Sequence, residues 1–283
     1  ATQQATALTD EQQRARDELA RLSDAAAQGG LQQALETLLQ ASTRWPALVT
    51  VIGTARPNPG VGKPLYNALL AIRDGHIVAE YYKQLLPTYG IFDEGRHFEP
   101  GPPGACTLAI AGCKVGFMIC EDGWNDDGRA YAVNPFEALH AARPDLIVSI
   151  NASPSHVGKR EQRHQIFGGS SRRHGLPILY VNQVGGHDQV VYDGASFAAE
   201  PEAGIVFEAP RFVEDLRTLT ASKFADSSSR LSVLSSISEL RPPMMPAMAT
   251  GSSLEQIISV FSSMRRFVPS SVSNSNGAEK RCT

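Results

Sequence analysis

The sequence predicts an α/β fold in which two sheets pack together and are covered by helices. Short apolar runs such as 115–119 and 146–150 have the length of buried strands. Other runs are joined by hairpin signals such as Asp74-Gly75, and polar helical stretches alternate with the strands. Hairpins that alternate with helices are typical of layered α/β domains.

The order of the expected elements follows from these patterns. We expect, in order, a helix over 10–42, a strand over 47–53, a hairpin over 65–73 and 77–83, a hairpin over 106–111 and 115–119, a helix over 134–142, a strand over 145–150, a helix over 158–174, a strand over 177–183 and a hairpin over 190–208.

Cys120 follows the apolar run 115–119 and precedes an acidic turn. A buried strand that ends at a cysteine directs the thiol to a surface or cleft, and a following helix N-terminus favours the thiolate. The alternative is a small core residue, since free cysteine is among the most buried residue types. Segments 82–101 and 146–154 also carry polar groups to the end of an apolar run, which is how α/β folds assemble a site.

Three motifs resemble one enzyme superfamily in letters, order and spacing. KQLLPTYGIFDEGRHFEPG, GFMICEDGW and INASPSHVGKREQR are similar to the lysine, cysteine and downstream substrate motifs of the nitrilase (carbon-nitrogen hydrolase) superfamily. Within it they resemble the glutaminase domains of glutamine-dependent NAD synthetases. The resemblance covers roughly residues 45–215 and rests on motifs far longer than a pattern that recurs by chance.

The resemblance implies an αββα sandwich with a Glu-Lys-Cys triad, and it implies that 45–219 is the glutaminase domain, after a helical segment over 1–44. Cys120 would attack the side-chain amide of glutamine, form a thioester and release ammonia, which would amidate deamido-NAD to NAD. Lys83, with the N–H after Cys120, would stabilise the oxyanion. Glu94 matches a second acidic position that supports the lysine and the thiol. Without the resemblance, Lys83 would be a solvated strand-end lysine and Glu94 a surface carboxylate.

Five further residues match the substrate-binding positions of the superfamily. Tyr89, Trp124 and Ser153 match a pocket of aromatic and hydrogen-bonding groups that suits glutamine. Lys159 and Arg163 are candidates to hold the substrate carboxylate, with Arg163 able to use two parallel hydrogen bonds. The alternatives are ordinary packing aromatics and a solvated basic helix start.

The superfamily's base is a glutamate in an FPEL-type motif upstream of the lysine segment, and no such motif occurs here. We therefore expect the first strand and its glutamate to be missing. Glu11, Glu18 and Glu36 lie in helix-like surroundings that are typical of a solvated face. Loss of a base removes roughly 10²- to 10⁴-fold in rate, and loss of the strand leaves ladder groups unpaired unless another segment replaces it.

A synthetase domain with an SGGxDS-type loop is not recognisable, and Gly168–Ser171 is interpreted as a turn. ATP and deamido-NAD would bind that domain, so we expect no cofactor in this chain. The segment 220–283 is rich in Ser, Pro and Met and is expected to be mostly disordered, with one amphipathic helix over 254–267. The change in composition suggests a truncated or frame-shifted reading frame.

Composition is that of an average globular protein, with 283 residues of which 42% are hydrophobic and 19% charged. A net charge of −3 gives no reason to expect nucleic acid or an anionic membrane as partner. A polar start and the lack of a spanning apolar run favour the cytoplasm. Cys106, Cys113, Cys120 and Cys282 suggest neither a disulfide framework nor a metal site, and His140 is interpreted as exposed or capping.

Three functions stay open at this point. The first is the glutaminase part of a glutamine-dependent NAD synthetase, with glutamine as substrate, a synthetase domain or subunit as partner, and a homo-oligomeric assembly. The second is a stand-alone amidase of the same superfamily that acts on another small amide. The third is a fragment that keeps the cysteine site but lacks the base and is inactive.

Overall fold

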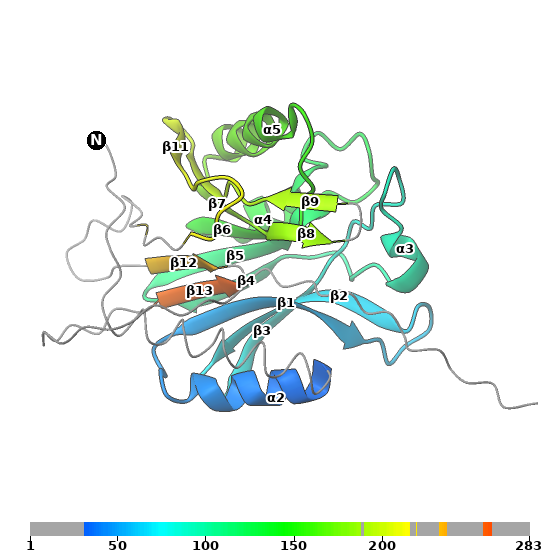
Figure 1. Ribbon diagram of the computed structural model, residues 1–283, viewed down its shortest axis with the longest axis vertical. Coiled ribbons are helices and arrows are strands. Elements are labelled where there is room, and N and C mark those ends of the chain that lie inside the picture. The colour runs from blue at the N-terminus through cyan, green and yellow to red at the C-terminus, as the bar shows by residue number, and fades with distance from the viewer. Residues whose placement is uncertain (1–30, 188–189, 216–218, 220–231, 237–256, 262–283) are drawn as a thin grey trace, which may run out of the picture.

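The computed structural model describes residues 31–187, 190–215, 219, 232–236 and 257–261. Its helices and sheets form four layers, with α2 on the outer face of the first sheet and α4 and α5 on the outer face of the second (Figure 1). The predicted arrangement of two sheets covered by helices is therefore confirmed. The helical elements are α2 (Leu31–Ser42), α3 (Glu94–His97), α4 (Pro135–Ala142), α5 (Lys159–His174) and the 3₁₀ turn η1 (Cys120–Gly123).

Two large sheets contain most of the described strands. The first has the order β12-β13-β1-β2-β3 and consists of β1 (Val49–Pro57), β2 (Leu65–Arg73), β3 (His76–Tyr82), β12 (Ser232–Ser236) and β13 (Ile257–Phe261). The second has the order β11-β10-β7-β6-β5-β4 and consists of β4 (Cys106–Ile110), β5 (Cys113–Ile119), β6 (Leu146–Asn151), β7 (Ile178–Asn182), β10 (Phe197–Glu200) and β11 (Gly204–Glu208). A separate pair contains β8 (Val184–His187) and β9 (Val190–Asp193).

Alternation along β5 shows how one strand serves two cores. Val115, Phe117 and Ile119 face the first sheet and join the core between the sheets, whereas Met118 faces α4 and α5 and packs with Phe167. Side chains alternate between the two faces of a strand, so a strand buried on both faces is a continuous apolar run. A third core lies between α2 and the first sheet.

Local turn and cap chemistry explains where several elements end. Asp74 and Gly75 have positive φ angles of 48° and 76° and join β2 to β3, as the Asp-Gly pair predicted. Ala111 and Gly112, with φ angles of 52° and 77°, join β4 to β5 in the same way. At the start of α4, the side chain of Asn134 accepts the N–H of Phe136 at 3.0 Å, which satisfies one of the unpaired helix donors.

β5, β6 and β7 run parallel, and their carboxyl ends meet at one edge of the second sheet. Cys120 follows β5, Ala152 follows β6 and Asn182 ends β7. As expected for the segments that end at Cys120 and at 151–154, β5 and β6 bring polar groups to this edge, and β7 adds Asn182. Lys83 comes from the first sheet, directly after β3.

Three sequence expectations are wrong in detail. The predicted hairpin over 190–208 divides, because β9 pairs with β8 and the hairpin proper is β10–β11. Gly168–Ser171 is not a turn but lies within α5. Within the expected helix over 254–267, residues 257–261 form strand β13, because a short apolar run fits a buried strand as well as a helix.

The C-terminal segment contributes to the first sheet beside β1. β13 pairs parallel with β1, with Val49 opposite Ile258 and Ile52 opposite Phe261, and β12 pairs with β13. The first sheet therefore continues past β1 through strands that lie far along the chain. Most of the expected helix over 10–42 and of the tail 220–283 lies outside the described residues, although 31–42 is helical as predicted. Within the described ranges, no helix combines the length and apolar character needed to cross a bilayer.

Candidate active site

Cys120 is held in a backbone conformation that disfavours most residues. It follows β5 directly, begins η1 and has a φ of 43°, in the left-handed region where a side chain costs energy. The backbone of Ala152, after the neighbouring strand β6, hydrogen-bonds to the thiol. The residue as a whole is half-buried, and its thiol stands at the end of a buried strand.

The protonation of Cys120 depends on four neighbours as well as on burial. Burial raises the pKa of this thiol to about 11, Lys83 lowers it, Glu94 and Glu121 raise it, and the Ala152 backbone lowers it. The thiol consequently keeps its proton at neutral pH, because its pKa lies well above 7. Attack on an amide therefore needs a group that accepts this proton.

Lys83 and Glu94 form an ion pair within electrostatic reach of the thiol. Lys83 has only 1% of its side chain exposed, and its Nζ donates to both carboxylate oxygens of Glu94 at 2.6 and 2.7 Å. Asn67 also donates to Glu94, at 3.3 Å. Burial by itself lowers the pKa of Lys83, but Glu94 and Cys120 outweigh it and the pKa is raised. Lys83 is a fixed cation, and the alternative of a solvated lysine is wrong.

Glu121 provides a second carboxylate next to the nucleophile. Its side chain is buried and accepts the phenol of Tyr89 at 2.9 Å and the phenol of Tyr131 at 2.9 Å. Burial, followed by the charge of Glu121, raises the pKa of both phenols, so they remain donors. Tyr89 was expected at the site, whereas Glu121 and Tyr131 were not; the adjacency of Glu121 to Cys120 was the available signal.

Trp124 and Lys159 lie together at the start of α5. The ammonium of Lys159 is 3.7 Å from the centroid of the Trp124 ring, a distance typical of a cation–π contact. Burial lowers the pKa of Lys159, Arg163 lowers it further, and Cys120 and Glu121 raise it. Cys120 and Glu121 therefore act electrostatically on this ammonium, and its substrate-binding role stays a prediction.

The guanidinium of Arg163 binds other groups of the protein. Its side chain is 1% exposed, and Nη1 donates to Asp193 at 2.7 Å. Nε donates to the hydroxyl of Ser153 at 3.2 Å, and Nη2 donates to the carbonyls of Ser153 and Pro154 at 2.7 and 3.0 Å. The predicted pair of parallel bonds to a substrate carboxylate is incompatible with these contacts. Arg163 instead fixes the turn that carries Ser153, which is itself buried.

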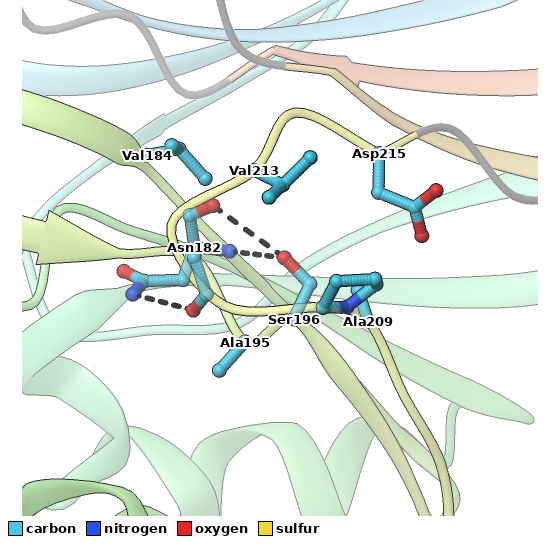
Figure 2. A pocket seen from close by; sticks show the side chains of 9 residues that line it. Asn182, Val184, Ala195, Ser196, Ala209, Val213 and Asp215 are labelled. Carbon is cyan, nitrogen blue, oxygen red and sulfur yellow. Dashed lines mark hydrogen bonds between the residues drawn. The ribbon is translucent and has the colours of Figure 1, made fainter.

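Asn182 holds the same turn from behind. Its side-chain oxygen accepts the N–H of Ser153 at 2.9 Å, and its amide donates to the carbonyl of Gly194 at 2.9 Å. Figure 2 shows a pocket on this side, where the Asn182 N–H donates to the hydroxyl of Ser196 at 2.9 Å. The lining of this pocket includes neither Cys120 nor Lys83, so it is not the cavity in which these two side chains meet a substrate.

Other candidate residues do not join the site. Glu36 is exposed on α2 and accepts a hydrogen bond from Gln32 at 2.9 Å, as expected for a solvated face. Glu11 and Glu18 lie outside the described residues, and His140 is exposed on α4. Among the residues that the structure describes, no three His, Cys, Asp or Glu side chains are grouped so that they could hold a metal ion.

Asp122 is a further residue that the sequence did not single out. It is fully buried within η1 and accepts hydrogen bonds from three segments of the chain. Three other acidic residues occur between 121 and 127, and the letters alone do not reveal which of them point inward.

Comparison with known proteins agrees with this geometry. Residues 17–222 match the family model described as carbon-nitrogen hydrolase. The chain is 36% identical over 183 residues to the glutamine-dependent NAD(+) synthetase of Synechocystis sp., covering 62% of this chain and 33% of that protein. It is 40% identical over 156 residues to the enzyme of the same name from Aquifex aeolicus, covering 55% of this chain and 26% of that protein. The chain thus spans about a third or less of these relatives.

Solved structures show the same fold. The glutamine-dependent NAD+ synthetase of Acinetobacter baumannii superposes with a TM-score of 0.62 at 24% identity, covering 82% of this chain and 45% of that one. An amidase from Nesterenkonia sp. AN1 superposes with a TM-score of 0.51 at 19% identity, covering 67% and 68%. Because the family match takes in the segments of Lys83, Cys120 and Ser153, the chain belongs to the carbon-nitrogen hydrolase family.

Proposed function

We propose that this site hydrolyses the side-chain amide of glutamine and that the ammonia serves to amidate deamido-NAD to NAD. The observation that carries the chemistry is the Lys83–Glu94 pair, buried within electrostatic reach of Cys120. The choice of glutamine is supported by relatives at 36% and 40% identity that are glutamine-dependent NAD(+) synthetases. Since the chain spans about a third or less of them, the synthetase step is assigned to a partner domain or subunit.

The reaction balances in two stages. In the first, Sγ of Cys120 bonds to the amide carbon, the C–N bond breaks, and the thiol proton leaves with the nitrogen as ammonia. In the second, water adds to the thioester, glutamate is released and the thiol regains a proton. The ammonium of Lys83 and the backbone N–H of Glu121 stabilise the charge on the carbonyl oxygen; loss of one such donor costs about 2.7 to 4 kcal/mol of transition-state stabilisation.

The proton transfers are assigned to Glu94. Among the described residues, Glu94 and Glu121 are the carboxylates that raise the pKa of Cys120. Glu121 is already engaged by the phenols of Tyr89 and Tyr131. Glu94 is engaged as well, by the ammonium of Lys83 through both oxygens, but this contact places it next to the group that stabilises the oxyanion, where it would accept the thiol proton.

A zwitterionic amino acid suits the charges around the thiol. Glu121 is a buried anion next to Cys120 and fits the α-ammonium group of glutamine. Lys159, held over Trp124, is a cation that fits the α-carboxylate. Opposite charges placed at fixed positions orient a small ligand, so its amide would be directed to Cys120. We place this reaction in the cytoplasm, where the free thiols of Cys106, Cys113 and Cys120 stay reduced, and we expect a homo-oligomer.

The test combines covalent labelling with turnover. Purified protein is treated with the glutamine analogue 6-diazo-5-oxo-norleucine and digested for mass spectrometry, and ammonia release from glutamine is measured in parallel. We expect a label on Cys120 and ammonia release, both lost in Cys120→Ala. Release from small aliphatic amides but not from glutamine would identify a stand-alone amidase. No label and no release would identify an inactive fragment.

A further inference from the structure

Asp122 joins the segment that carries Cys120 to the segment that carries Lys83. One carboxylate oxygen accepts the backbone N–H groups of Gln84 and Leu85, at 3.1 and 2.8 Å. The other accepts the phenol of Tyr81 at 2.8 Å and the backbone N–H of Ile119 at 3.3 Å. These donors flank Lys83 on both sides and immediately precede Cys120.

The environment of this carboxylate makes the contacts rigid. Asp122 has no exposed surface, so no water replaces a lost partner. Tyr81 is tied in turn by Gln84, whose side-chain amide donates to the Tyr81 hydroxyl at 3.0 Å and to the Gly104 carbonyl at 2.7 Å. Buried hydrogen bonds to a charged group are among the strongest in proteins, and a fully connected network fixes one arrangement of the backbone.

We propose that Asp122 is a positioning residue for amide hydrolysis, which sets the placement of the Lys83 ammonium relative to the Cys120 thiol by binding the backbone on both sides. Glu94 holds the end of the Lys83 side chain, whereas Asp122 holds the main chain from which that side chain starts. The two carboxylates therefore have separate tasks, one at the ammonium and one at the backbone. This inference deepens the proposed function but is tested without turnover.

The test measures the coupling between Lys83 and the thiol. Four proteins are compared: the parent, Lys83→Met, Asp122→Asn and the double variant. The rate of alkylation of Cys120 by iodoacetamide is followed at pH 8 by mass spectrometry of its peptide. A cation near a thiol lowers its pKa by about one unit or more, so Lys83→Met should slow alkylation about tenfold. In the Asp122→Asn background we expect Lys83→Met to slow the alkylation of Cys120 by less than about threefold.

Asparagine is chosen because it keeps the size of the side chain and one acceptor oxygen. Its NH₂ group would face the N–H of Ile119, so the link to the Cys120 segment is lost while the one to Gln84 and Leu85 is kept. Asp145→Asn is the matched control, since Asp145 accepts the N–H of Lys114 at 2.8 Å near the other end of β5. The tenfold effect of Lys83→Met should persist in that background.

An equal effect of Lys83→Met in the parent and Asp122→Asn backgrounds overturns the proposal. If Asp122→Asn does not fold, Tyr81→Phe takes its place, because it removes one donor to Asp122 and leaves the charge. The effect of Lys83→Met should then shrink by a smaller factor, and an undiminished tenfold effect again overturns the proposal. Alkylation of Cys120 needs no substrate, so this test does not depend on glutaminase activity. If Asp122→Asn reduces the effect of Lys83→Met in a protein that does not hydrolyse glutamine, only the proposed function is disproved.

Discussion

At the scale of single residues, the site combines a buried cation with a thiol whose protonation depends on its surroundings. Lys83 is a buried cation with one carboxylate on its ammonium, and Cys120 is a thiol whose pKa burial raises to about 11. A buried charge is tolerated when it is paired. The carboxylate of Glu94 is therefore needed to keep the ammonium of Lys83 buried in the folded protein. Function and stability are therefore coupled at these positions.

Glu94→Gln tests this coupling. The substitution removes the carboxylate that binds the buried ammonium of Lys83 directly, and breaking a buried pair by removing one partner costs about 3 to 5 kcal/mol. We expect the free energy of unfolding in urea to fall by about 3 kcal/mol. The control is Glu80→Gln, which breaks the Arg56–Glu80 pair, whose cation is 27% exposed against 1% for Lys83, and should cost about 0 to 1 kcal/mol. Equal losses in the two variants would contradict the expectation.

Asp122 predicts a pH dependence of stability. Burial raises its pKa to about 6 from an ordinary value of 3.8, while Lys83 and the backbone donors lower it. The folded state therefore binds this proton more tightly, and stability falls as pH rises between these values. Relative to Asp122→Asn, the parent should lose about 3 kcal/mol between pH 4 and pH 7. Urea unfolding at several pH values measures this, and parallel profiles would refute it.

At the scale of elements, the 3₁₀ turn η1 is fixed by its packing against α5. A Cβ at Gly123 would lie 2.5 Å from the ring of Phe167 and 3.2 Å from the sulfur of Met118. Phe167 is fully buried and contacts the rings of Trp124 and Tyr180 edge-on. The Phe167 ring has little room to move. The position of Cys120 in the same turn therefore depends on glycine at position 123.

Gly123→Ala should destabilise the protein, whereas Gly169→Ala should not. Overpacking of a filled core costs about 1 to 3 kcal/mol, and the turn would shift together with Cys120. At Gly169, in the interior of α5, an added Cβ meets nothing within 4 Å, and alanine should gain about 0.5 to 1 kcal/mol from helix propensity. Thermal unfolding of both variants measures the difference, and a stable Gly123→Ala protein would show that Phe167 can yield.

Much of the fold and part of the site could be predicted from the sequence. The hairpin at Asp74-Gly75 and the proposed catalytic roles of Lys83 and Cys120 depend on local signals, namely a turn dipeptide and long motifs. Contacts between residues that are far apart in the sequence leave no such local signal. The pairing of β9 with β8 and the orientation of Asp122 are decided by packing, and so is the engagement of Arg163 with Asp193.

At the scale of the whole molecule, segments far apart in sequence complete the first sheet. β13 lies beside β1, more than 200 residues downstream in the sequence, and covers its edge at Val49–Ile52. An unpaired strand edge is open to solvent and to other chains. We therefore expect the C-terminal segment to protect β1 as well as to extend the sheet.

A chain that ends at residue 219 tests the role of β13. The amides of 49–52 that pair with β13 should exchange with solvent faster in the shortened chain, whereas those of β5 and β6, inside the second sheet, should not change. Hydrogen exchange followed by mass spectrometry resolves the two regions. Unchanged exchange over 49–52 would mean that β13 does not protect this edge in solution.

The left-handed backbone at Cys120 sets the stability of the fold against the presence of the thiol. Glycine adopts a φ of 43° without the cost of about 1 to 3 kcal/mol that other residues incur. Under selection for folding alone, this position would be free to drift to glycine and the protein would gain stability. Cys120→Gly should therefore unfold at a higher denaturant concentration than the parent while it loses the proposed nucleophile, so the fold and the proposed chemistry make opposite demands on this residue.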